Sequence, residues 1–126
     1  MTDSSRDLSP LAGRAILIVE DEYFVMKRLT RALEDAGATV VGPVASVSAA
    51  LALTLDGTPL DAAVLDVNLL GEMVFPVADA LAARGVPYAF ATGYDPDVIP
   101  ARHAGIPLLR KPVDPAAIVA ALFTAG

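Results

Sequence analysis

Short apolar runs recur along the chain, separated by stretches whose apolar residues return every three or four positions. The runs are too short for a helix and lack its period, so they predict buried strands. They cover residues 15–19, 39–41, 60–65, 87–91 and 108–109. Strands that alternate with helices predict a parallel sheet with helices on both faces, because right-handed crossovers place the helices there.

Helices are predicted between the strands and after the last one. They cover residues 22–36, a segment from Ser46 or Ser48 through Leu55, residues 76–84, a weak segment around 97–104, and a last helix after Asp114. The last is well signalled, since Asp114 can cap it and Pro115 suits its first position. Five strands and five helices thus form one domain over residues 14–126, after a flexible tail over residues 1–13.

The composition excludes several classes of protein. With 126 residues, 55% hydrophobic, the chain is one domain's worth with a single core. Its net charge of -6 argues against nucleic-acid binding, and the absence of cysteine excludes disulfides and thiolate metal sites. The uncharged stretch 36–55 is interrupted by Gly37, Gly42 and Pro43, which argues against a membrane span. Without a signal-like N-terminus, we expect a cytoplasmic protein.

Four of the predicted strands lead into side chains that can do chemistry. These are Glu20 and Asp21, Asp66, Thr92, and Lys111. Ligands of such sheets bind beyond the carboxyl ends of the strands, so we expect the five side chains to share one pocket. Three carboxylates so close disfavour joint ionisation unless a cation neutralises them, which predicts a hard divalent ion such as Mg²⁺.

The segments around these side chains resemble the four signature segments of a two-component response-regulator receiver domain. They are residues 16–22 (ILIVEDE), 63–68 (AVLDVN), 91–93 (ATG) and 110–112 (RKP). The resemblance covers residues 14 to 124, and FATGY at 90–94 further resembles the FATGUY subgroup of stand-alone receivers. It implies a flavodoxin-like doubly wound fold with strand order 2-1-3-4-5.

The resemblance also implies a role for each site residue. Asp66 would accept a phosphoryl group, Glu20, Asp21 and Asp66 with the Asn68 backbone carbonyl would hold Mg²⁺ (or Mn²⁺), and Thr92 and Lys111 would contact phosphoryl oxygens. Asn68 and Tyr94 would tune how fast water removes the phosphoryl group. The Lys111–Pro112 bond matches one that is often cis in the family.

Two departures from the family pattern concern the output. Leu108 stands where receivers usually carry an aromatic switch residue, and we interpret Tyr94 as taking over its signalling role. Asp66 and Thr92 are 26 positions apart, a few fewer than is typical, which predicts a shortened third helix or preceding loop.

The resemblance implies partners on both sides of the reaction. A sensor histidine kinase or a histidine phosphotransfer protein would supply the phosphoryl group, so the domain is a phosphoacceptor and not an enzyme. We expect no output domain after Gly126. Output would then pass to a downstream protein through residues 95–110 and 114–124, or the domain would act as a phosphate sink or relay.

Other interpretations remain open at this point. Glu20 and Asp21 alone would suit the positive N-terminus of a helix. An Asp-nucleophile phosphatase typically needs a general acid where Asn68 stands, and a flavodoxin-type phosphate loop is incompatible with residues 20–22. A receiver-like interaction module that works without phosphorylation is the main alternative. We interpret His103, the only histidine, as a surface residue.

Overall fold

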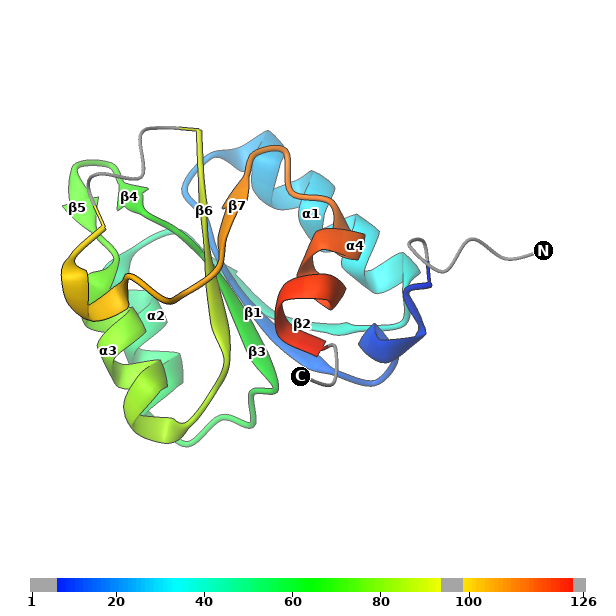
Figure 1. The fold of residues 1–126 in the computed structure, drawn as a ribbon, viewed down its shortest axis with the longest axis horizontal. Helices are drawn as coiled ribbons and strands as arrows, with labels where there is room; N and C mark the ends of the chain where they lie inside the picture. Colours follow the sequence, from blue (N-terminus) through cyan, green and yellow to red (C-terminus); the bar gives the residue numbers. More distant parts are fainter. Residues whose placement is uncertain (1–6, 94–98, 124–126) are drawn as a thin grey trace.

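A five-stranded parallel sheet forms the centre of the computed structural model, which describes residues 7–93 and 99–123. Its strands are β2 (Thr39–Val44), β1 (Ala15–Val19), β3 (Ala62–Asp66), β6 (Tyr88–Thr92) and β7 (Leu108–Arg110), in this spatial order (Figure 1). Counted along the chain, these are strands 2-1-3-4-5. The predicted flavodoxin-like sheet is therefore confirmed.

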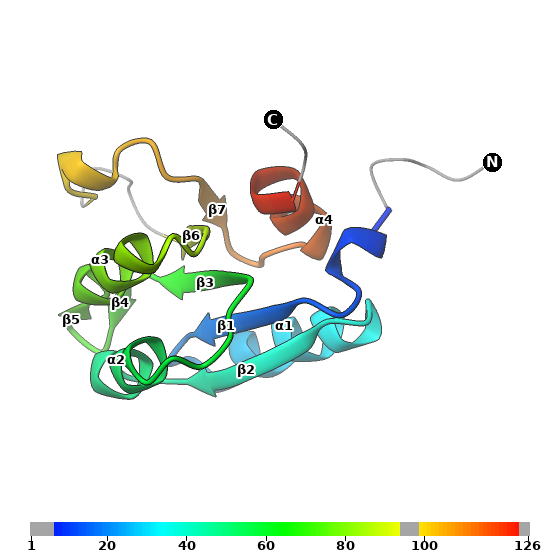
Figure 2. The same ribbon diagram turned by 90° about the horizontal axis from the view of Figure 1, so that it is seen from below.

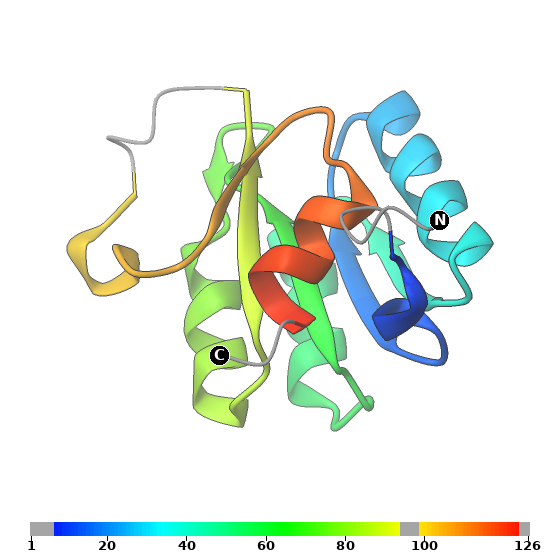
Figure 3. The ribbon, with the colours of Figure 1, turned by 45° about the vertical axis from the view of Figure 1, so that its right-hand side comes forward.

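Two helices cover each face of the sheet. Helices α2 (Val47–Leu55) and α3 (Phe75–Arg84) lie on one side, and α1 (Tyr23–Asp35) and α4 (Pro115–Ile118) lie on the other (Figures 1 and 3). The side chains of Ser46 and Asp114 accept hydrogen bonds from the amides of Ala49 and Ala116, so both predicted caps form. Helix α4 continues as a π-helical turn over Val119–Phe123.

The described residues contain four α-helices, one fewer than predicted. Within the weak segment 97–104, the described part forms only a short 3₁₀ turn over Ala101–His103. Pro100 precedes this turn and Pro107 follows it. A proline lacks the amide hydrogen and clashes with the preceding helical turn, so there is little room for a full helix here.

Both faces of the sheet are buried, which explains why its strands are apolar throughout. Leu17, Leu65 and Phe90 point toward α2 and α3, whereas Ile16 and Val64 point toward α1 and α4. Successive residues of a strand face opposite sides, so each strand contributes to both layers of the core. No helix in the described ranges has the length and apolarity needed to cross a bilayer.

Part of the predicted flexible tail is folded onto the domain. Ser9–Leu11 form a 3₁₀ turn, and Leu11 is fully buried in the layer of α1 and α4. The amide of Gly13 also donates to the carbonyl of Gly37 at 2.8 Å. Residues 1–6 lie outside the described residues.

The connection between β3 and α3 is not a simple loop. It forms a two-stranded antiparallel hairpin, β4 (Asn68–Leu69) and β5 (Glu72–Met73), which the sequence analysis did not predict. Its turn holds Leu70 with a positive φ of 52° and Gly71 with 90°. Figure 2 shows the hairpin at the edge toward which the arrowheads of β1 and β3 point.

We expect Leu11→Ala to lower the free energy of unfolding by about 2–4 kcal/mol, because it leaves a cavity in a packed layer. The matched control is Leu55→Ala on α2, whose side chain is exposed, and which should change stability by less than about 0.5 kcal/mol. Urea denaturation of both variants measures the difference. Equal effects of the two substitutions would show that the segment before β1 is not part of the core.

Candidate functional site

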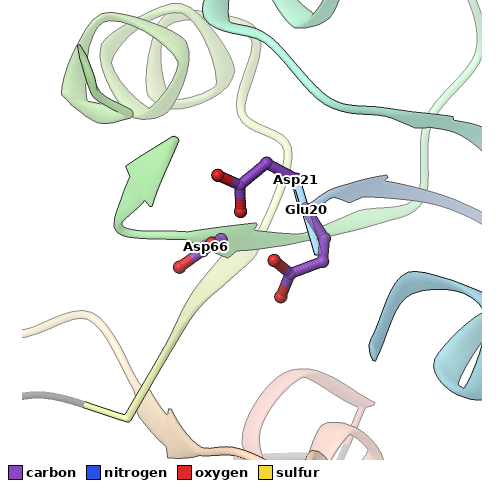
Figure 4. A group of neighbouring side chains, drawn as sticks. All are labelled: Glu20, Asp21 and Asp66. Atoms are coloured by element: carbon purple, nitrogen blue, oxygen red, sulfur yellow. The ribbon is translucent and has the colours of Figure 1, made fainter. Parts of the chain in front are cut away.

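The register of two central strands brings three carboxylates together. Val19 of β1 pairs with Leu65 of β3, so Glu20 and Asp66, the next residues of each strand, lie side by side. Oxygen atoms of Glu20, Asp21 and Asp66 all lie within 4.8 Å of one another, and Figure 4 shows the carboxylates around a shared space. The strand ends thus build the acidic cluster that the sequence predicted.

The backbone around the cluster fixes the direction of two of these side chains. A carboxylate oxygen of Glu20 accepts the amide hydrogen of Glu22 at 3.1 Å. Asp21 accepts the amide hydrogen of Leu70 at 2.9 Å, from the turn of the hairpin. Residues 49 positions apart are therefore tied directly, and the hairpin is held against the acidic cluster.

Lys111, directly after β7, supplies a positive charge to the cluster. Its Nζ lies 2.5 Å from Glu20 Oε1 and 3.2 Å from Asp66 Oδ2. The bond between Lys111 and Pro112 is cis, as the resemblance implied. The chain end of β7 thus reaches across β6 and β3 to the residue that follows β1.

The electrostatic balance of the cluster appears in the pKa of Asp66. Burial raises it to about 7, with further contributions from the hydrogen bond and the negative charge of Glu20, while Lys111 opposes the rise. Burial acts to lower the pKa of Lys111, but its hydrogen bond to Glu20 and the charges of Asp66 and Glu20 outweigh this and raise it. One ammonium group therefore does not fully compensate the carboxylates.

This residual negative charge fits a hard divalent cation. The donors are carboxylate oxygens, which Mg²⁺ and Mn²⁺ accept, and the buried pair Glu20 and Asp66 gains most from neutralisation. The pocket above them, about 900 Å³, is open and lined by Asp21, Glu22, Asp66 and Lys111 among others, which leaves room for waters and a phosphate. Such a mixed shell is usual for Mg²⁺.

Thr92 and Asn68 lie at the same edge of the sheet as Asp66. Asp66 pairs with Ala91 of β6, so Thr92 lies one position further at the same edge, where it is 3% exposed. The side chain of Asn68 accepts the amide hydrogen of Gly71 at 2.7 Å, which turns its amide toward the hairpin. The structure therefore brings Thr92, Asn68 and Lys111 to the cluster, and the role of each stays a prediction.

The structure describes only one of the two predicted switch residues, Tyr94 and Leu108. Tyr94 falls outside the described residues. Leu108 starts β7, pairs with Phe90 in the sheet and is 36% exposed. Its side chain is thus available at the surface of the face predicted for output.

The interpretation of His103 as a surface residue is wrong. Its side chain is 3% exposed and lies between Tyr88 of β6 and Asp79 of α3. A lone histidine in a proline-flanked segment gives no sequence signal for this position, because its partners lie 15 and 24 positions away.

Large apolar side chains stand exposed near the acidic pocket, which sequence reasoning did not identify. Phe24 and Tyr23 at the start of α1 are 79% and 59% exposed, and Leu70 on the hairpin is 88% exposed. Phe24 also lines a mostly apolar cavity of about 170 Å³ whose walls include Glu20 and Asp66. Asp66 thus has an apolar surface beside it.

Among comparisons with known proteins, only the search of solved structures found similar proteins. No known family profile and no curated protein matches the chain. Among solved structures it is similar to SdrG from Sphingomonas melonis Fr1, at 46% identity over 90% of this chain and 95% of SdrG, with a TM-score of 0.75. It is also similar to SdrG from Pseudomonas melonis Fr1 in its BeF3-activated conformation, at 45% identity over 90% of this chain and 98% of that chain, with a TM-score of 0.75. The response regulator PhyR from Brucella abortus is 26% identical over 95% of this chain and 52% of PhyR, with a TM-score of 0.76.

The raised pKa of Asp66 predicts a pH-dependent stability in the absence of divalent ions. Its ordinary value is 3.8, so native protein holds this proton up to about pH 7 while unfolded protein releases it near pH 4. The stabilisation is complete below pH 4 and is lost as the pH rises to 7. In EDTA, we therefore expect the stability of wild type relative to Asp66→Asn to fall between pH 5 and pH 7.5.

Urea denaturation at these two pH values measures this difference. Addition of 10 mM Mg²⁺, roughly a saturating level for a weak carboxylate site, should raise the free energy of unfolding of the wild type more than that of the variant. A difference that stays constant with pH would contradict the assignment.

Removal of the ammonium group should strengthen binding of a divalent ion. Lys111→Met leaves Glu20 and Asp66 without their cation, and we expect the affinity for Mg²⁺ to rise by about three- to tenfold. Isothermal titration calorimetry measures it. The control is Lys27→Met on the exposed side of α1, which should leave the affinity unchanged. A weaker affinity in Lys111→Met would show that the ion does not bind among these carboxylates.

Proposed function

The chain belongs to the family of response-regulator receiver domains, and we propose that it accepts a phosphoryl group on Asp66 from a phosphohistidine of a partner protein. One observation carries this proposal. A buried carboxylate lies at a strand end with two further carboxylates within 4.8 Å and an ammonium group at 3.2 Å. This is the charge arrangement that phosphoryl transfer requires, because its catalysis consists mainly of positioning and charge neutralisation.

The transfer is a displacement at phosphorus. An oxygen of Asp66 forms a bond to phosphorus while the bond from phosphorus to the histidine nitrogen breaks, and its electron pair stays on the imidazole. When bound, Mg²⁺ would supply positive charge that offsets the charge on the phosphoryl oxygens. Glu20, Asp21 and Asp66 would hold this ion. Its charge, together with that of Lys111, would favour the ionised, nucleophilic form of Asp66 against the effect of Glu20.

Lys111 and Thr92 act on the transferred group. The ammonium group of Lys111 already lies 3.2 Å from Asp66 Oδ2, so a short movement pairs it with a phosphoryl oxygen. Thr92 donates its hydroxyl to another oxygen from the end of β6. Thr92 ends β6 and Lys111 directly follows β7, so contact with the phosphoryl group would involve both ends of the segment that contains the β6–β7 connection and β7.

Water removes the phosphoryl group at a rate that Asn68 and Tyr94 tune. An amide at position 68 does not transfer protons, so it provides no general acid for rapid hydrolysis. The domain therefore works as a phosphoacceptor and not as an enzyme on a separate substrate.

The exposed apolar residues beside the pocket support contact with a donor protein. Asp66 is 5% exposed at the floor of the pocket, so the donor histidine must enter while its surroundings rest on the rim. Phe24 on α1 and Leu70 on the hairpin would provide that contact. The proposed donor is a sensor histidine kinase or a histidine phosphotransfer protein, which the domain would meet in the cytoplasm.

Output passes by contact with a downstream protein through the face of residues 95–124, or the domain serves as a phosphate sink or relay. Within the described part of this face, Leu108 is the exposed large apolar residue. SdrG, the similar protein, has a BeF3-activated conformation. We expect beryllofluoride, which resembles a phosphoryl group, to bind Asp66 in the same way.

Incubation with acetyl phosphate and Mg²⁺ should add one phosphoryl group to the wild type, detected by mass spectrometry of the intact protein. Asp66→Asn should gain none, because an amide oxygen is too weak a nucleophile. Asp35→Asn, at the exposed end of α1, is the matched control and should be phosphorylated like the wild type. A phosphoryl group on Asp66→Asn would show that Asp66 is not the acceptor. None on the wild type with Mg²⁺ would favour the interaction module that works without phosphorylation.

A further inference from the structure

A chain of hydrogen bonds runs through the buried imidazole of His103. Nδ1 lies 2.9 Å from the hydroxyl of Tyr88, and Nε2 lies 2.9 Å from Oδ1 of Asp79. Three elements are joined in this way: the strand β6, the 3₁₀ turn that carries His103, and the helix α3.

The donors and acceptors of this chain can be assigned from chemistry. The hydrogen bond from Arg102 holds the pKa of Asp79 below its ordinary value, so Asp79 is a carboxylate and only accepts. Burial, with the charge of Asp79, raises the pKa of Tyr88, so its hydroxyl keeps its proton. In a neutral ring, Nε2 therefore donates to Asp79, and Nδ1 accepts from Tyr88. The hydroxyl of Tyr88 and both ring nitrogens of His103 therefore each have a hydrogen-bond partner.

Aromatic contacts enclose the same imidazole. It stacks on Phe75 at 5.8 Å with an interplanar angle of 19°, and it meets Phe90 and Tyr88 edge-on at 5.7 and 6.0 Å. Phe75 is the first residue of α3, and Phe90 pairs with Leu108 in the sheet. The ring is thus wedged between the start of α3 and the strand next to β7.

Asp79 has a second partner in the same turn. Nε and Nη2 of Arg102 lie 3.0 and 3.1 Å from its two oxygens. Both Arg102 and Asp79 are about half exposed there, so this pair contributes little by comparison with the buried chain. Asp79 is nevertheless the common anchor of two consecutive residues.

The anchored turn lies in the connection between β6 and β7, of which residues 93 and 99–107 are described. This connection begins after Thr92 and leads through β7 to Lys111, the two residues assigned to the phosphoryl oxygens. Ile99 and Ile106 are only partly buried against the core, whereas His103 is enclosed. Within the described residues of the connection, side-chain hydrogen bonds to the rest of the domain come from Arg102 and His103.

We propose that the hydrogen-bonded Tyr88–His103–Asp79 network is a latch that holds the turn within residues 99–107 in the position of the unliganded domain, and that a group bound at Asp66 favours its release. This regulation rests on the function proposed above. A ligand shifts an equilibrium only by its preference for one state, so a latch that stabilises the resting state lowers the apparent affinity for a phosphoryl mimic.

Asp79→Ala tests the latch, since position 79 lies on a half-exposed helical surface that accepts alanine. Amide hydrogen exchange in residues 99–107, measured by mass spectrometry without any phosphate or mimic, should become about tenfold faster or more, while exchange in α1 is unchanged. Asp79→Asn keeps an oxygen that accepts from Nε2 and should lie between wild type and Asp79→Ala. Arg102→Gln breaks only the exposed pair and should resemble wild type.

Calorimetric titration with beryllofluoride in Mg²⁺ tests the coupling to the acceptor. We expect Asp79→Ala to bind about three- to tenfold more tightly than wild type, and Tyr88→Phe, which removes the other end of the chain, to bind more tightly as well. Unchanged exchange in residues 99–107, or faster exchange in all elements alike, would overturn the latch. Faster local exchange with equal or weaker binding of beryllofluoride would overturn its coupling to Asp66.

Failure of the proposed function gives a different result. If the wild type binds no beryllofluoride, the phosphoacceptor role and the coupling both fall, while the exchange of the unliganded variants still decides whether Asp79 anchors the connection.

Discussion

The parallel pairing of β1 with β3 is the constraint on which the site depends. Their register sets Glu20 beside Asp66 and so forces two carboxylates into one buried position. Like charges in such a place are tolerated only with compensation, and the domain provides it from the far side of the sheet through Lys111. The acidic residues, the cation and the strand order therefore form one electrostatic unit.

The incomplete neutralisation of this unit is what favours a bound cation. Lys111 divides its charge between Glu20 and Asp66, and Asp66 retains a raised pKa near 7. A fully compensated cluster would bind a divalent ion weakly, and an uncompensated one would destabilise the fold. The arrangement leaves a free-energy gain for a bound cation and, in the proposed function, for a phosphoryl group.

The connection between β6 and β7 links this chemistry to the rest of the surface. Its two ends lead to Thr92 and Lys111, and its middle is held by His103 among Phe75, Tyr88 and Phe90. Leu108, in the place of the usual aromatic switch residue, pairs with Phe90 of the same group. In this chain the aromatic and polar contacts beside the proposed output face are therefore concentrated around β6 and the buried His103.

The sequence by itself determined the alternation of strands and helices, the caps at Ser46 and Asp114, and the placement of Glu20, Asp21, Asp66, Thr92 and Lys111 at strand ends. These features depend on local periodicity and on neighbouring residues, and a parallel sheet necessarily brings the carboxyl ends of its strands to one edge.

Only the tertiary structure decided the burial of Leu11 and His103, the hairpin β4–β5, and the division of the Lys111 charge between two carboxylates. Each of these depends on partners distant in sequence, such as Asp79 for His103 or Asp21 for Leu70. Local propensity carries no information about which distant groups will meet. A polar residue such as His103 appears exposed in the sequence until the fold supplies the hydrogen bonds that allow its burial.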